Sequence, residues 1–174
     1  QKYFDKFPVD SITLPNVIED DLDDVPPLGV KMARPDRDNA SVTKHNQWKH
    51  AVQAYLACIN FTDTCLGRVL QALDESPHRD NTIIVLWSDH GWHLGEKQHW
   101  RKFALWEEAT RVVMMWSVPG MTTGGQRCDA PVNLLDIYPT LVDLCGLPAN
   151  DRLEGTSLRS LLKNPSGKRD QPTL

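Results

Sequence analysis

The sequence of 174 residues lacks long apolar runs and any concentration of positive charge. No segment approaches the roughly 20 consecutive apolar residues that cross a bilayer, so we expect no membrane span and no membrane partner. Lysine and arginine are scattered and the formal net charge is −4, which leaves no field for binding nucleic acid phosphates. These absences favour a globular protein that binds a small or locally anionic ligand in a pocket.

Cysteine is scarce and is not spaced for metal binding. The sequence has no Cys-x-x-Cys pair, so zinc-knuckle and thioredoxin-like sites are not supported. Cys58 and Cys65 are seven residues apart on an expected helix, roughly 10 Å along its axis, which is too far for a disulfide. A disulfide between Cys128 and Cys145 stays open. The first residues resemble neither a signal peptide nor a translation start, so we expect the chain to begin inside a longer protein.

Apolar periodicity divides the chain into two regions. Residues 1–45 contain prolines and paired acids with little periodicity, which predicts an irregular segment packed on the domain that the rest of the chain forms. From residue 46 helical spacing predicts one long helix to about Asp74. The runs Thr82 to Ser88 and Val112 to Val118 predict fully buried strands, because their apolar residues do not alternate with polar ones.

The remaining elements complete an α/β pattern. A short helix is expected around Leu105 to Ala109, and another from Asn133 to Cys145 with Gly146 as its C-cap. Helices that alternate with buried strands predict a mixed or mostly parallel sheet flanked by helices. Asp136 lies near the start of the last helix, where its charge suits the helix dipole, so capping is favoured over catalysis.

The segment Ser-Asp-His-Gly-Trp-His-Leu, residues 88–94, directly follows the first expected strand. In α/β proteins, ligands bind where strands end. Asp89 offers a hard anionic oxygen and His90 a neutral nitrogen, and the freedom of Gly91 in a turn would let both face one metal ion. The segment is therefore the first candidate for the site.

Each candidate residue also has a structural interpretation. Asp89 and His90 fit a capping carboxylate and a solvated imidazole equally well. A zinc site built from His90, His93 and His99 is another alternative, although this spacing matches no standard zinc motif. Lys102 follows among aromatic residues, which would limit its solvation and strengthen its hold on an anion. The alternative for Lys102 is an ordinary solvent-exposed lysine.

The order of the motifs is more specific than any one of them. The expected strand is followed by Ser-Asp-His-Gly at 88–91, Leu-Gly-Glu at 94–96, Trp100, Lys102, Glu-Glu-Ala-Thr-Arg-Val at 107–112 and Asp-Ile-Tyr-Pro-Thr-Leu at 136–141. This order resembles the sulfatase family of the alkaline phosphatase superfamily, and within it the iduronate-2-sulfatase-like branch. The resemblance extends from about Tyr3 to Leu162. It implies that residues 46–174 form the C-terminal part of an alkaline-phosphatase-like α/β domain.

The resemblance also implies a reaction, which is hydrolysis of a sulfate ester by a formylglycine bound to one Ca²⁺, with Ca²⁺ favoured over Mg²⁺. The substrate would be a sulfated small molecule or glycan. Asp89 and His90 would bind the metal, and Lys102 would bind the sulfate as a catalytic residue, with His99 and Trp100 also binding substrate. A hard cation draws charge from the sulfuryl group and an ammonium neutralises the remainder. Secreted, periplasmic or lysosomal placement is implied by the family alone.

Several features of that family are absent from the sequence. No cysteine lies in the Cys/Ser-x-Pro/Ala-x-Arg segment that supplies the nucleophile, and the paired N-terminal aspartates of the calcium site are also missing. We therefore expect the chain to be inactive alone and to need the N-terminal remainder of the sulfatase domain. Two alternatives stay open: a phosphodiesterase or phosphonate monoester hydrolase of the same superfamily, and a noncatalytic fragment that keeps the fold.

Overall fold

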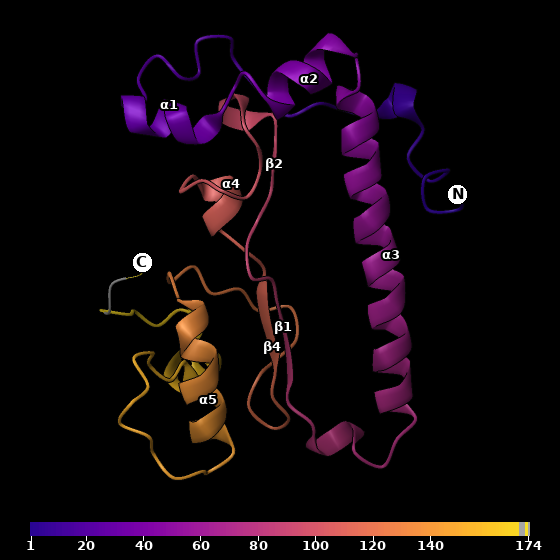
Figure 1. Ribbon diagram of the computed structural model, residues 1–174. Helices are drawn as coiled ribbons and strands as arrows, with labels where there is room; N and C mark the ends of the chain where they lie inside the picture. Colours follow the sequence, from indigo (N-terminus) through magenta and orange to yellow (C-terminus); the bar gives the residue numbers. More distant parts are fainter. Residues whose placement is uncertain (171–172, 174) are drawn as a thin grey trace. The chain divides into compact units, whose positions relative to one another are not determined.

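The computed structural model describes residues 1–170 and 173, and these fall into two compact units. The first unit comprises residues 1–79 and 90–113, and the second comprises residues 80–89 and 114–174. Figure 1 shows the elements of both. The predicted division at residue 45 and the packing of residues 1–45 on a catalytic domain stay predictions.

One long helix organises the first unit. This helix, α3, spans Trp48–Asp74 and confirms the predicted long helix (Figure 1). Its side chains Val52 and Ala57 are buried. The short helix η1, Val9–Ser11, contacts α3, so part of the N-terminal segment packs along this helix. Periodic apolar positions are what allow one face of a helix to be covered while the opposite face stays in water.

Residues 1–45 contain two short helices where irregular structure was expected. Helix α1 spans Pro27–Ala33 and helix α2 spans Asp38–Lys44, so the expectation is wrong for these two stretches. A proline at the first position of α1 costs no hydrogen bond, because the first amides of a helix lack a partner within it. Each helix has seven residues, which is too few to produce a clear helical period in the sequence.

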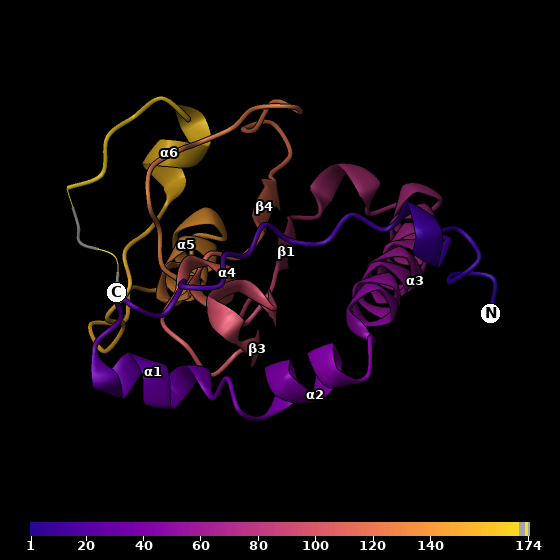
Figure 2. The same cartoon turned by 90° about the horizontal axis from the view of Figure 1, so that it is seen from above.

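A short hairpin follows in the first unit. Strands β2, His93–Leu94, and β3, Trp100–Arg101, pair antiparallel and are joined through the 3-10 helix η3, Glu96–Gln98. Figure 2 shows α2 beside β3, and the side chains of the two elements are hydrogen-bonded. Helix α4, Glu107–Thr110, confirms the short helix that was expected near residues 105–109.

The second unit contains both predicted buried strands as one antiparallel pair. Strand β1 spans Ile84–Trp87 and strand β4 spans Met114–Ser117. The predicted α/β class is confirmed. The antiparallel pair is consistent with the predicted mixed sheet, because a mixed sheet contains antiparallel as well as parallel pairs. The alternative of a mostly parallel sheet gains no support, since both strand pairs in residues 1–170 and 173 are antiparallel.

These two strands are less covered than the sequence predicts. The side chains of Trp87 and Met115 are 48% and 54% exposed. The prediction of full burial is therefore wrong for the described residues. A sheet of two strands has two open edges, and an uninterrupted apolar run does not show which neighbours will cover it.

The last predicted helix forms in two parts, η4 at Leu134–Asp136 and α5 at Ile137–Leu144. Gly146 has a φ of 62°, and its amide and that of Leu147 close the final turn onto α5, as in a Schellman motif. The predicted C-cap is therefore confirmed. Helix α6, Arg159–Lys163, packs against α5.

Asp136 is a buried polar centre of the second unit. Its carboxylate accepts hydrogen bonds from the amides of Asn133 at 2.7 Å and Thr156 at 2.8 Å, and it also pairs with the guanidinium of Arg169. Burial alone would raise the pKa of Asp136, but the bonds from Arg169 and the two amides outweigh it and hold the pKa below its usual value. The predicted capping role is confirmed.

All four cysteines are free thiols and exposed. The disulfide that stayed open between Cys128 and Cys145 is therefore not formed. Among the helices of residues 1–170 and 173, none combines the length and apolar character needed to cross a membrane.

Candidate functional site

His90 and Lys102 meet in the first unit. The Nζ of Lys102 lies 2.8 Å from Nε2 of His90, and Nδ1 of His90 lies 2.8 Å from the carbonyl oxygen of Gly91. A carbonyl can only accept, so Nδ1 carries the proton and Nε2 presents a lone pair to the ammonium. The structure thus brings together two of the predicted site residues and fixes the tautomer of the imidazole.

The hairpin of β2 and β3 brings the chain back from His90 to Lys102. The indole Nε1 of Trp48, at the start of α3, donates to the carbonyl of Leu94 at 2.7 Å. Gly95 has a φ of 122°, and an added Cβ would lie 2.2 Å from the Trp48 ring, so this turn requires glycine. Lys102 is therefore supported by a loop that is anchored on the long helix.

Residues of the N-terminal segment hold the strained part of this loop. Lys97 and Gln98 have φ values of 54° and 49°, a conformation that ordinary side chains adopt rarely. Lys97 Nζ donates to the carbonyl of Asp21 at 2.9 Å, and Gln98 Nε2 donates to the carbonyl of Glu19 at 2.8 Å. These contacts could not be predicted from the sequence, since no local pattern links positions that are 76 and 79 residues apart.

Gly91 is needed for a reason other than the predicted one. It is not among the residues with positive φ, so the expectation that it supplies conformational freedom to the turn is wrong. Its amide donates to the carbonyl of Ala109 at 2.8 Å, and an added Cβ would lie 1.9 Å from the carbonyl oxygen of Glu108. The backbone of α4 lies too close to Gly91 for any side chain at this position.

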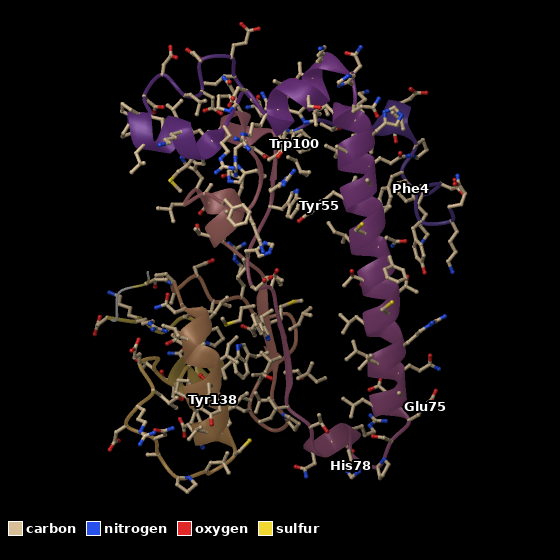
Figure 3. The ribbon with its side chains drawn as sticks, viewed as in Figure 1. Phe4, Tyr55, Glu75, His78, Trp100 and Tyr138 are labelled. Carbon is tan, nitrogen blue, oxygen red and sulfur yellow. The ribbon has the colours of Figure 1, made fainter. Side chains whose placement is uncertain are left out.

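The two predicted substrate-binding neighbours of Lys102 are buried. His99 is 5% exposed and its Nδ1 donates to the carbonyl of Ala33 at 2.7 Å. Trp100 is 7% exposed, and its Nε1 donates to Oδ1 of Asn39 at 3.1 Å. Figure 3 shows Trp100 inside the first unit, next to α2. Both side chains form part of the packing between β3 and the N-terminal helices, and their contact with substrate stays a prediction.

His93 lies beside His99 in a buried aromatic cluster. Its ring centroid is 4.9 Å from that of His99 and 5.7 Å from that of Trp106, and its Nε2 is 4.0 Å from a carboxylate oxygen of Glu108. Burial lowers the pKa of His93, which is fully buried. No group of three or more His, Cys, Asp or Glu side chains in residues 1–170 and 173 is placed to hold a metal ion, so the zinc alternative gains no support.

The donor types of Asp89 and His90, a carboxylate oxygen and an imidazole nitrogen, are ones that divalent cations take. Asp89 is exposed and offers carboxylate oxygens. A histidine that ligates a metal usually donates its other ring N–H to a carboxylate or a backbone carbonyl, as His90 does toward Gly91. The lone pair of His90 already faces a cation, the ammonium of Lys102. Two side chains are fewer than the six to eight ligands that Ca²⁺ takes, so this chain would supply part of the shell.

Comparison with known proteins identifies the family. The family model described as Sulfatase matches residues 5–147. A sulfatase from Formosa agariphila is 47% identical over 174 residues, which cover 98% of this chain and 34% of that protein. Iduronate 2-sulfatase from Mus musculus is 36% identical over 124 residues, covering 58% of this chain and 22% of its own length. The chain belongs to the sulfatase family and spans about a third of the length of the Formosa relative.

Solved structures agree with this assignment. A protein in complex with its substrate D-glucosamine-2-N,6-O-disulfate is 32% identical, with a TM-score of 0.66 over 70% of this chain and 24% of that one. The phosphonate monoester hydrolase of Silicibacter pomeroyi is 25% identical, with a TM-score of 0.77 over 90% of this chain and 32% of its own. The predicted alkaline-phosphatase-like fold is confirmed, and the chain forms part of such a domain.

Proposed function

We propose that the protein containing this chain is a sulfuric ester hydrolase and that the chain contributes part of its active site. The observation that carries the proposal is the contact between Lys102 and His90 in a member of the sulfatase family. We propose a sulfated glycan as the substrate. This choice is supported by the disulfated glucosamine that one solved relative takes as its substrate.

Lys102 is proposed to bind the sulfate group. Its ammonium is partly buried and lies 5.9 Å from the centroid of the Phe103 ring, which reduces its contact with water. An ammonium held in a partly dry position attracts an anion more strongly than one in bulk water. It can therefore offset the negative charge that builds up on the sulfuryl oxygens during hydrolysis.

Asp89 and His90 are proposed to hold a divalent cation, with Ca²⁺ favoured over Mg²⁺ because Ca²⁺ tolerates irregular coordination. When bound, the ion would act as a Lewis acid on the sulfate ester. The Nε2 lone pair of His90 can serve one partner at a time, so a metal ion bound there would replace the contact with Lys102, whose three N–H donors could then all face the sulfate.

The nucleophile is proposed to be a formylglycine in the N-terminal remainder of the sulfatase domain. None of the four cysteines of this chain lies in the expected segment. The first measurement is the intact mass of the purified material under denaturing and native conditions, followed by peptide mapping. A peptide that carries formylglycine and accompanies this chain supports the proposal, and this chain purified alone as the active species contradicts it.

Activity and metal binding test the proposal directly. The intact protein is expected to hydrolyse an aryl sulfate faster than an aryl phosphonate. Its melting temperature is expected to rise with millimolar Ca²⁺, and Asp89→Ala is expected to abolish that rise. Absence of turnover together with absence of a Ca²⁺ effect would favour a noncatalytic fragment that keeps the fold.

A phosphonate monoester hydrolase is the second candidate. The structural similarity to the Silicibacter pomeroyi enzyme covers 90% of this chain and is the observation that favours it. Both reactions remove a group from a tetrahedral oxyanion, so the Asp89 and His90 segment suits either of them. Faster turnover of the phosphonate in the comparison above would replace the sulfatase proposal with this one.

A further inference from the structure

A cavity of about 480 Å³ opens in the first unit where α1 and α2 face β3. Most of the charged side chains that line it are basic. Asp38 is the acidic residue of the lining, and the cationic residues are Lys31, Arg34, Arg37 and Arg101. Lys31, Arg34 and Arg37 lie within seven residues of one another in the sequence, and folding brings Arg101 of β3 to the same cavity.

The cavity carries an excess of positive charge. Arg101 and Asp38 neutralise each other through two contacts, Nε to Oδ2 at 2.9 Å and Nη2 to Oδ1 at 3.0 Å. Within residues 1–170 and 173, the cationic groups of Lys31, Arg34 and Arg37 form neither an ion pair nor a hydrogen bond. A cleft lined by one sign of charge concentrates its field, so these three cations favour an anionic ligand.

A buried imidazole lines the same cavity. His99 is 5% exposed, and its Nδ1 donates to the carbonyl of Ala33. Its Nε2 has no hydrogen-bond partner among the described residues. A buried polar atom without a partner costs free energy, so the ring adds an unsatisfied polar atom behind the cavity lining.

The apolar part of the lining also suits a sugar. Phe103 and Leu28 line the cavity and are 71% and 70% exposed. Aromatic and aliphatic surface beside a few polar groups is typical of small-molecule sites. Lys102 lies between the lining residues Arg101 and Phe103 in the chain, so the proposed sulfate-binding lysine adjoins the cavity in sequence.

We infer that this cavity binds a second anionic group of the glycan, a sulfate or a carboxylate, on the same sugar as the ester or on the next one. The inference rests on the proposed function and adds a preference for polyanionic substrates. Arg34 and Arg37 would contact the oxyanion, because the planar guanidinium matches two oxygens of a carboxylate or a sulfate. Lys31 would add charge without this geometric requirement.

The test compares two oligosaccharides in the intact protein that contains this chain. One carries the scissile sulfate ester and a second anionic group, and the other carries the ester alone. Arg34→Gln is expected to raise KM for the first roughly fivefold to tenfold, as loss of one charge-assisted hydrogen bond would do, with a much smaller change for the second. Arg68→Gln removes the same charge from the exposed surface of α3 and is expected to leave the ratio of the two KM values unchanged.

Three further arms make the outcome decisive. Arg37→Gln repeats the test if Arg34→Gln does not fold. Versions of the first oligosaccharide with a second sulfate or a carboxylate identify which anion is bound. If the ratio of the KM values for the two oligosaccharides is unchanged in both Arg34→Gln and Arg37→Gln, the inference is overturned. Hydrolysis of the sulfate ester in the same experiment would still uphold the proposed function. If neither substrate is hydrolysed, the proposed function fails, and weaker binding of the doubly anionic oligosaccharide to Arg34→Gln still supports the cavity as an anion site.

Discussion

Nζ of Lys97 lies 2.8 Å from Oδ1 of Asp21, and the amide of Lys97 donates to Oδ2 of the same carboxylate at 3.1 Å. One carboxylate thus binds both the side chain and the backbone of a residue that has a positive φ. The hydrogen bond between the Lys97 side chain and the Asp21 carboxylate is the main cause that lowers the pKa of Asp21. The same hydrogen bond is the main cause that raises the pKa of Lys97. The loop that leads to Lys102 is held in place by this pair.

Asp21→Asn is therefore expected to lower the free energy of unfolding by about 1 kcal/mol at pH 7. Because the folded state lowers the pKa of Asp21, its stabilisation is present above the unfolded value near 3.9 and is lost as pH falls through the folded pKa. Urea unfolding at pH 7 and at decreasing pH measures this. Asp24→Asn is the control, since Asp24 is 83% exposed and 3.7 Å from Lys97. Equal effects of both substitutions on the free energy of unfolding would contradict a stabilising role for the Asp21–Lys97 pair.

Gly91→Ala is expected to destabilise the protein strongly, by about 2 kcal/mol or more, because the new methyl group would overlap the backbone of α4. The same change should reduce activity, since it displaces the residue that follows His90. Gly67→Ala is the matched control in the middle of α3, where an added Cβ meets nothing within 4 Å. It is expected to stabilise the protein by about 0.5–1 kcal/mol, as alanine favours the helix. A shift of the melting temperature in the same direction for both variants would contradict the close contact between Gly91 and the backbone of α4.

The elements that could be predicted from the sequence are those with a local signal. Helix α3 has many turns of apolar periodicity, both strands are continuous apolar runs, and Gly146 supplies the conformation that ends α5. Helices α1 and α2 are too short to give such a signal. The covering of the strands also could not be predicted, because it depends on neighbours that a strand's own residues do not specify.

The site shows the same division between local and distant information. The order of the motifs identified His90 and Lys102, and the structure places them 2.8 Å apart. The resemblance also implied that His99 binds substrate, which stays a prediction; its ring is 5% exposed and bonded to α1, and this packing had no signal in the sequence. The gathering of Arg34 and Arg37 opposite β3 depends on how the N-terminal helices pack, and residue spacing does not show this.

His93 is expected to make the protein sensitive to mild acid. Burial lowers its pKa in the folded state, so the unfolded chain binds a proton first as pH falls below about 6.5. The unfolded state then holds more protons, and the free energy of unfolding decreases between pH 6.5 and the folded pKa. Unfolding curves of His93→Gln should show a flatter dependence on pH over that interval. His45→Gln, at an exposed histidine, is the control for the loss of one imidazole.

Asp136→Ala is expected to cost about 3–5 kcal/mol, because it leaves the buried guanidinium of Arg169 without its partner and two amides without an acceptor. Asp129→Ala removes an exposed carboxylate that pairs with Arg127 and should change stability little. Chemical denaturation of both variants measures the contrast. A small effect of Asp136→Ala would mean that the capping box and the buried ion pair contribute less than their burial indicates.

Lys102→Met tests the role of the lysine against a structural alternative. If Lys102 binds the sulfate, turnover of a sulfate ester by the intact protein should fall about 10²–10³-fold, the usual cost of removing one group that stabilises developing charge. The melting temperature should change little, because a partly exposed lysine contributes little to folding. Lys44→Met, at an exposed lysine in the last turn of α2, is the control and should retain full turnover. A large drop in melting temperature with turnover reduced only in proportion to unfolded protein would make Lys102 a structural partner of His90.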